Sequence, residues 1–108
     1  MTGPVGVPVA LGAEGRGAVV GLASADLNVN EVAWPPGAGV REHRNDLVDV
    51  LFVVVEGAMT VTLDGQGHDV PHGHMIVIPK GTVRAVAAGP DGVRYVTCHR
   101  RRPPLGIT

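Results

Sequence analysis

The chain has 108 residues, 44% of them hydrophobic, and a formal net charge of −1. This size and composition suit one compact domain, and the near-neutral charge gives no reason to expect binding to nucleic acid or to an anionic membrane. The single cysteine, Cys98, excludes an internal disulfide. We therefore expect a cytoplasmic protein, because a chain without disulfides is compatible with a reducing compartment.

Residues 1–17 are rich in glycine and proline and predict an irregular N-terminal arm. Short runs of alternating or wholly apolar residues follow, each bounded by turn residues, and this pattern is typical of β-strands. We expect eight or nine short strands, within residues 18–23, 27–34, 40–44, 48–55, 58–63, 68–70, 74–78, 82–88 and 93–99.

Glycine, proline and aspartate mark the expected turns. Gly57 is expected to end the strand before it, and Asp64-Gly65 is a signal for a hairpin turn. Pro79-Lys80-Gly81 predicts a type I turn, with proline in the second position and glycine in the fourth. Residues 89–92 predict a further turn, and we expect residues 103–108 to form a C-terminal tail.

No segment shows the periodicity of an amphipathic helix, so the sequence predicts an all-β protein. A closed antiparallel barrel or jelly roll removes the exposed sheet edges of such a chain, and we expect a single domain of this kind over residues 18–102. Residues 48–55 are almost wholly apolar, which is typical of a strand covered on both faces. A second copy of the chain would cover the outer face, so we expect a homodimer.

Two segments carry a family resemblance. One segment resembles the second sequence motif of the cupin family, because its spacing is similar: Gly73, Pro79, Gly81 and Arg84. The family has histidine in the last of these positions. Upstream, the sequence PGAGVREH of residues 36–43, followed by an apolar strand that ends in Glu56-Gly57, resembles the first cupin motif. The resemblance covers roughly residues 27–99 and implies a cupin-type jelly-roll β-barrel that commonly forms dimers.

The resemblance also implies a divalent metal, which cupins hold with two histidines and a glutamate of the first motif and a histidine of the second. Carried over by position, these four ligands fall on His43, Asn45, Val50 and Arg84. Valine has no lone pair to offer, and the arginine side chain carries only hydrogen-bond donors and repels a cation. We therefore expect no metal and no other cofactor.

In the family register, Arg84 faces the inside of the barrel. The ligand pocket is then predicted to contain a floor of apolar side chains with three polar residues above it: His43, Asn45, Val50, Phe52, Val54, Arg84 and Val86. A buried guanidinium requires a negative partner. The sequence leaves two sources open, which are an internal carboxylate (Glu42, Asp46 or Asp49) and the carboxylate or phosphate of a ligand.

The functional prediction is a metal-free cupin that binds a small anionic molecule. His43 is the candidate catalytic residue, because a neighbouring cation favours the neutral imidazole that acts as a base near pH 7, and an isomerase or cyclase acting on a small acid would fit. One alternative is a metal-dependent oxidoreductase with a rebuilt site of His43, Asp49 and His99. The other is a non-catalytic homo-oligomeric scaffold for protein interactions.

Overall fold

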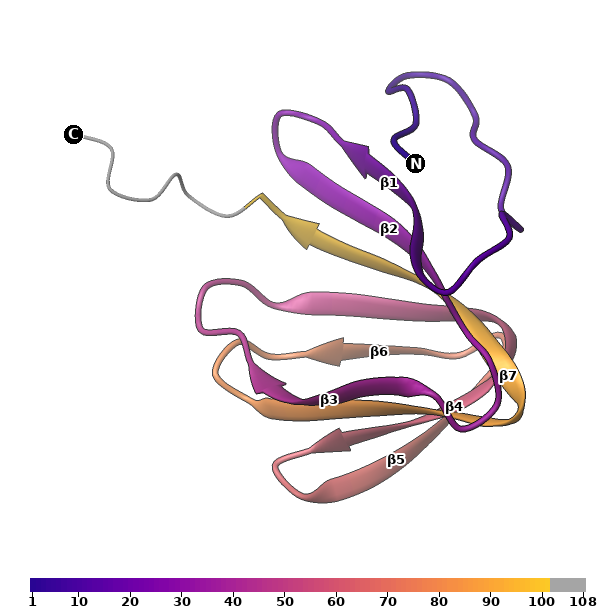
Figure 1. The fold of residues 1–108 in the computed structure, drawn as a ribbon. Helices are drawn as coiled ribbons and strands as arrows, with labels where there is room; N and C mark the ends of the chain where they lie inside the picture. Colours follow the sequence, from indigo (N-terminus) through magenta and orange to yellow (C-terminus); the bar gives the residue numbers. More distant parts are fainter. Residues whose placement is uncertain (102–108) are drawn as a thin grey trace.

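A computed structural model describes residues 1–101 of the chain as an all-β jelly roll (Figure 1). The described residues contain seven strands and no helix, and thus no helix that is long and apolar enough to cross a membrane. The all-β prediction is confirmed. The strands are β1 (Gly17–Ala23), β2 (Leu27–Trp34), β3 (Gly39–Arg44), β4 (Val50–Leu63), β5 (Gln66–Pro71), β6 (Met75–Ile78) and β7 (Val83–Arg100).

Two strands are longer than the sequence predicts. Gly57 does not end a strand, because β4 continues through it, and residues 89–92 do not form a turn, because β7 continues through them. The two strands pair with each other on both sides of Gly57, with register shifts that leave residues 89–92 of β7 without a partner on β4. Gly57 has a φ of 69°, and a Cβ atom there would overlap the carbonyl oxygen of Gly92. The glycines therefore bend the two strands where they pass closely, and neither strand ends there.

The bends divide the sheet into two facing layers, which Figure 1 shows joined on one side and open on the other. The first, named here the β2 layer, contains β1, β2, β6, residues 50–56 of β4 and residues 93–100 of β7. The second, the β3 layer, contains β3, β5, residues 58–63 of β4 and residues 83–88 of β7. All pairings between these strands are antiparallel, as predicted.

The turns give one confirmation and one correction. Asp64 and Gly65 both have positive φ, 48° and 84°, as a type I′ hairpin turn between β4 and β5 requires. The turn after β6 differs from the expected type I, because the Thr82 N–H donates to the Pro79 carbonyl and closes the turn one residue later. Gly81 then occupies the third position with a φ of 84°, which is the geometry of a type II turn.

The core lies between the two layers. Along β4, inward-facing Val50, Phe52, Val54, Met59 and Val61 are all at most 4% exposed, and the residues between them are less buried. The outer face of β4 was expected to be covered. In the single chain it is only half-buried at Leu51 and Val53, and the adjacent strand β6 exposes Met75 and Val77.

Residues 1–16 form an arm that is bonded to the β2 layer. Met1 and Gly3 make backbone hydrogen bonds with Gly21 of β1, both of 2.8 Å. Further along the arm, the Gly12 N–H donates to the carboxylate of Glu31 at 2.7 Å. The expected tail over residues 103–108, with Arg102 at the end of the predicted domain, lies outside the described residues.

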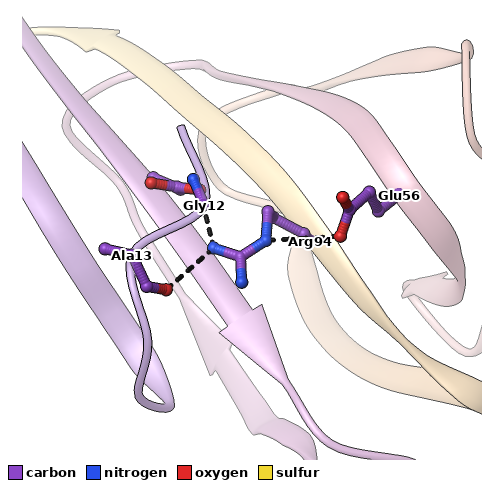
Figure 2. A network of polar contacts seen from close by, with 5 residues as sticks. Gly12, Ala13, Glu56 and Arg94 are labelled. Atoms are coloured by element: carbon purple, nitrogen blue, oxygen red, sulfur yellow. Dashed lines mark hydrogen bonds and ion pairs between the residues drawn. The ribbon is translucent and has the colours of Figure 1, made fainter. Parts of the chain in front are cut away.

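A buried ion pair holds the arm in place. Glu31 of β2 is 3% exposed and accepts a hydrogen bond of 2.6 Å from Nη1 of Arg94 on β7. The same Nη1 donates to the Ala13 carbonyl, and Nε of Arg94 lies 3.5 Å from the exposed carboxylate of Glu56. Figure 2 shows Arg94 between Ala13 of the arm and Glu56 of β4. This network was not foreseen from the sequence.

Candidate functional site

A cavity of about 290 Å³ lies between the two layers and is lined by residues of both. The β3 layer contributes Val40, His43, Arg84 and Val86, and the β2 layer contributes mainly aromatic and neutral polar side chains. An apolar wall with a few convergent polar groups is the usual composition of a small-molecule site. A second hollow of about 350 Å³ lies at the bend around Trp34 and Gly92 and contains none of the predicted site residues.

His43 and Arg84 lie opposite each other on β3 and β7, and their side chains are bonded. Arg84 Nε donates to His43 Nε2 at 3.1 Å. The other ring nitrogen, Nδ1, lies 3.1 Å from the carbonyl oxygen of Arg41, which only accepts. Together these contacts assign the proton to Nδ1 and leave Nε2 as the acceptor, so His43 is a neutral imidazole in this arrangement.

Arg84 also spans the space between the layers. Its strand belongs to the β3 layer, while its Cζ lies 5.7 Å from the ring centroid of Phe52 in the β2 layer. A guanidinium at this distance from an aromatic face is within the range of a cation–π interaction. The expectation that Arg84 faces inward is thus matched by its position: it is half-buried and forms part of the cavity wall.

An aromatic group lies on the opposite wall. Trp34 donates its indole N–H to the Tyr95 hydroxyl at 3.2 Å, and the rings of Tyr95 and Phe52 pack with centroids 5.1 Å apart. Burial raises the pKa of Tyr95 above its usual value of 10.0, whereas the hydrogen bond from Trp34 and the charge of Arg84 act in the opposite direction. Tyr95 is therefore a protonated phenol at neutral pH.

Of the seven residues predicted to form the pocket, the structure brings five together on the cavity wall: His43, Val50, Phe52, Arg84 and Val86. Asn45 and Val54 are not among the residues that line it. Asn45 follows the end of β3, and its Oδ1 accepts the backbone N–H groups of Leu47 and Val48, so it organises the loop before β4. Val54 is 1% exposed and packs in the core. That the five residues bind a ligand stays a prediction.

Two of the three acidic residues that were candidate partners of Arg84 make contacts elsewhere. Asp46 pairs with Nε of Arg44 at 2.9 Å, and the Asp49 carboxylate accepts the Lys80 backbone N–H at 2.8 Å. Asp49 is exposed because the neighbouring Val50 points inward, as strand alternation requires.

The residues present do not fit a metal centre. His43 and His99 line the cavity, but Asp49 does not, and within residues 1–101 no group of three histidine, cysteine or acidic side chains is arranged to hold a metal ion. His43 Nε2 already accepts a hydrogen bond from a cation. A non-haem iron site needs two histidines and a carboxylate, and a catalytic zinc about three ligands.

Several residues on the cavity wall were missed. The β2 layer places Asn30, Trp34, Tyr95 and Thr97 there. Their signal is non-local, because Asn30 becomes an inward residue only when β2 is paired with β7 in the observed register, in which it lies opposite Thr97. These residues can be found from the sequence only if β2 and β7 are first aligned as a pair in the correct register.

Comparison with known proteins matches residues 30–98 to the cupin domain family. The dimethylsulfoniopropionate lyase DddW of Ruegeria pomeroyi is 30% identical over 70 residues, which represent 65% of this chain and 45% of the lyase. The chain thus spans less than half the length of that relative.

Solved structures share the architecture. KdgF from Halomonas sp. superposes with a TM-score of 0.65 at 29% identity, over 73% of each chain. An RmlC-like cupin from Methanocaldococcus jannaschii, described as a double-stranded β-helix, superposes with a TM-score of 0.73 over 94% of this chain and 95% of its own. Its identity of 17% supports similarity of fold alone.

Proposed function

The chain belongs to the cupin family, and from that premise we propose that it binds a small organic anion, a carboxylate or a phosphate, in the cavity between its two layers. The observation that carries the proposal is the position of Arg84 on the inner wall, beside His43 and over the ring of Phe52. A planar guanidinium suits the paired oxygens of a carboxylate or phosphate. The surrounding aliphatic and aromatic side chains would strengthen such a contact, because they lower the local polarity.

His43 is the candidate acid–base group of this pocket. Its Nε2 lone pair accepts a hydrogen bond from Arg84 Nε. An anion that binds the guanidinium would compete for this N–H and leave the lone pair of His43 available. A neutral imidazole freed next to the ligand can accept a proton near pH 7. Isomerisation or cyclisation of a small acid needs a base of this kind.

The relatives give a consistent but distant indication. The name of the lyase from Ruegeria pomeroyi identifies a substrate with a propionate group, which is a small carboxylate. Because this chain covers only 45% of that enzyme, the lyase activity itself is not transferred here. The cavity of this chain is of a size that suits a small acid, since 290 Å³ corresponds to roughly ten water molecules at about 30 Å³ each.

Binding is testable with the protein's own fluorophore. Trp34 is the single tryptophan and lines the cavity, so its fluorescence and the melting temperature together report occupancy. A panel of carboxylates and phosphates is titrated into the wild type, Arg84→Met and the control Arg41→Met, which removes an exposed cation of β3 outside the cavity wall. We expect binding to weaken about 10- to 100-fold in Arg84→Met only, as loss of a charge-assisted hydrogen bond predicts.

Two results would overturn the proposal. One is a wild-type protein that neither changes its fluorescence nor gains melting temperature with any carboxylate or phosphate. The other is an Arg84→Met variant that binds the same anions as tightly as the wild type.

We also propose that two copies of the chain associate through the outer face of β6 and β4. The support is the exposure of Met75, 71%, and Val77, 56%, beside half-buried Leu51 and Val53. An apolar strand exposed in this way commonly marks an interface. Such a dimer is compatible both with a ligand-binding role and with the scaffold alternative.

A further inference from the structure

The wall opposite Arg84 carries neutral polar groups. Asn30 of β2 and Thr97 of β7 are direct cross-strand partners in the β2 layer, and both line the cavity. Residues paired in this way have Cβ atoms about 5 Å apart, so the amide and the hydroxyl act on the same small volume. On the other side of Thr97 lies its β4 partner, Phe52, over whose ring the Arg84 guanidinium sits.

The side chains of Asn30 and Thr97 have donors and acceptors that are available to a ligand. Within the part of the chain that the structure describes, neither side chain has a hydrogen-bond partner, and both residues are half-buried. A polar group in a partly buried site gains free energy when a ligand supplies the missing bond. The amide offers both donors and an acceptor, and the hydroxyl offers one donor and two acceptor lone pairs.

We infer that the anion bound in this cavity is a hydroxy acid, whose anionic group contacts Arg84 and whose hydroxyl group is held by Asn30 and Thr97. The inference rests on the proposed function and names its ligand class. A hydroxyl group donates and accepts at once, which matches a pair of side chains that can each do both. An ammonium group is disfavoured, because Arg84 already places a positive charge in the cavity. A carbonyl group would leave the Asn30 amide oxygen without a donor.

Tyr95 extends this polar surface. It is the inward-facing residue of β7 two positions before Thr97. Its oxygen accepts the Trp34 indole N–H, so the phenolic proton is available for donation to a ligand. A second oxygen of the ligand would find a donor there. The preferred ligands are therefore small acids with one or more hydroxyl groups rather than plain fatty acids.

The test compares acids that differ only in hydroxyl groups. The probes are propionate against lactate, succinate against malate and tartrate, and hexanoate against gluconate, with binding followed by Trp34 fluorescence and melting temperature. The proteins are the wild type, Thr97→Val, Asn30→Leu and a matched control, Thr62→Val, whose hydroxyl lies on β4 outside the cavity wall. Phosphate and 3-phosphoglycerate are added as a second pair, which separates carboxylate from phosphate as the anionic group.

In the wild type and in Thr62→Val, we expect at least one hydroxy acid to bind about tenfold more tightly than its plain analogue, as one or two net hydrogen bonds predict. Thr97→Val and Asn30→Leu should lose this preference while keeping their affinity for the plain acid. Equal binding of hydroxylated and plain acids by the wild type would overturn the inference and leave the anion site intact. Failure of every acid to bind would overturn the proposed function as well.

Discussion

Arg84 Nε lies 3.1 Å from His43 Nε2, and the two residues are cross-strand partners on β7 and β3. In the resemblance to the cupin motifs, they stand at two of the four positions that hold the metal ligands. One position keeps its imidazole, and the other presents a cation whose N–H occupies the imidazole's lone pair. In the proposed function, the guanidinium of this pair contacts the anion directly.

The first prediction concerns metal content. Elemental analysis of protein purified without a metal-affinity tag should find iron, manganese, zinc and copper well below one equivalent, because the cavity wall offers no set of three ligands and Nε2 of His43 accepts from Arg84. His43→Ala serves as the comparison. Stoichiometric metal in the wild type that is lost in His43→Ala would contradict this and favour the oxidoreductase alternative.

Tyr95 should lose its phenolic proton at a higher pH in the folded protein than in the unfolded chain. Its pKa is raised by burial, so the folded protein holds the phenolic proton more tightly than the unfolded chain, whose tyrosine has a pKa near 10. The resulting contribution to stability is complete below about pH 10 and is lost as the pH rises through the folded pKa. Tyr95 is the only tyrosine, so phenolate absorbance follows it directly in native and denatured protein. A native midpoint at or below the denatured one would refute the prediction.

The buried partner of Arg94 should matter more than the exposed one. Glu31→Gln leaves a mostly buried guanidinium without the negative charge of its 2.6 Å partner, and we expect a loss of about 2 kcal/mol, below the 3–5 kcal/mol of fully buried pairs because the Arg94 side chain is 18% exposed. Glu56→Gln is the control, since its side chain is 74% exposed and such pairs contribute about 0–1 kcal/mol. Chemical denaturation measures both, and similar losses for the two variants would count against the network.

The bend at Gly57 should not tolerate a side chain. Gly57→Ala combines a φ of 69° with overlap against the Gly92 carbonyl, and we expect a loss of at least about 2 kcal/mol. Gly73→Ala has a similar φ, 77°, with no atom within 4 Å of the added Cβ, so it should cost only about 1 kcal/mol. The difference in stability between the two variants, measured by thermal melting, gives the cost of the overlap with the Gly92 carbonyl. Equal effects would mean that β4 and β7 separate at little cost.

The outer face of β6 provides the test of assembly. Light scattering after size-exclusion chromatography should show a dimer for the wild type and a monomer for Val77→Glu, because a charge on an apolar interface loses its hydration. Leu47→Glu changes another exposed apolar residue, in the loop before β4, and should remain a dimer. A wild type that is monomeric across the micromolar range would remove the proposal.

The sequence alone was sufficient for features that depend on chemical identity or on near neighbours. Alternating valine-rich runs predicted an all-β protein, and Asp64-Gly65 predicted a hairpin turn, because the left-handed backbone that such a turn needs is accessible to these two residue types. That Val50 and Arg84 cannot act as ligands at the positions which the cupin resemblance assigns to a metal can also be read directly, since an alkyl chain or a guanidinium cannot coordinate a cation in any fold.

The tertiary structure decided what depends on pairing between distant strands. Gly57 and residues 89–92 look like chain breaks locally, yet the strands bend there and continue, because β4 and β7 pair with each other again on the far side of the bend. Asn30 faces the cavity only because β2 pairs with β7 in one register, and Glu31, its neighbour, faces the arm for the same reason. A one-residue shift of register exchanges the two faces of a strand, and no local pattern in a strand with polar residues on both faces determines that shift.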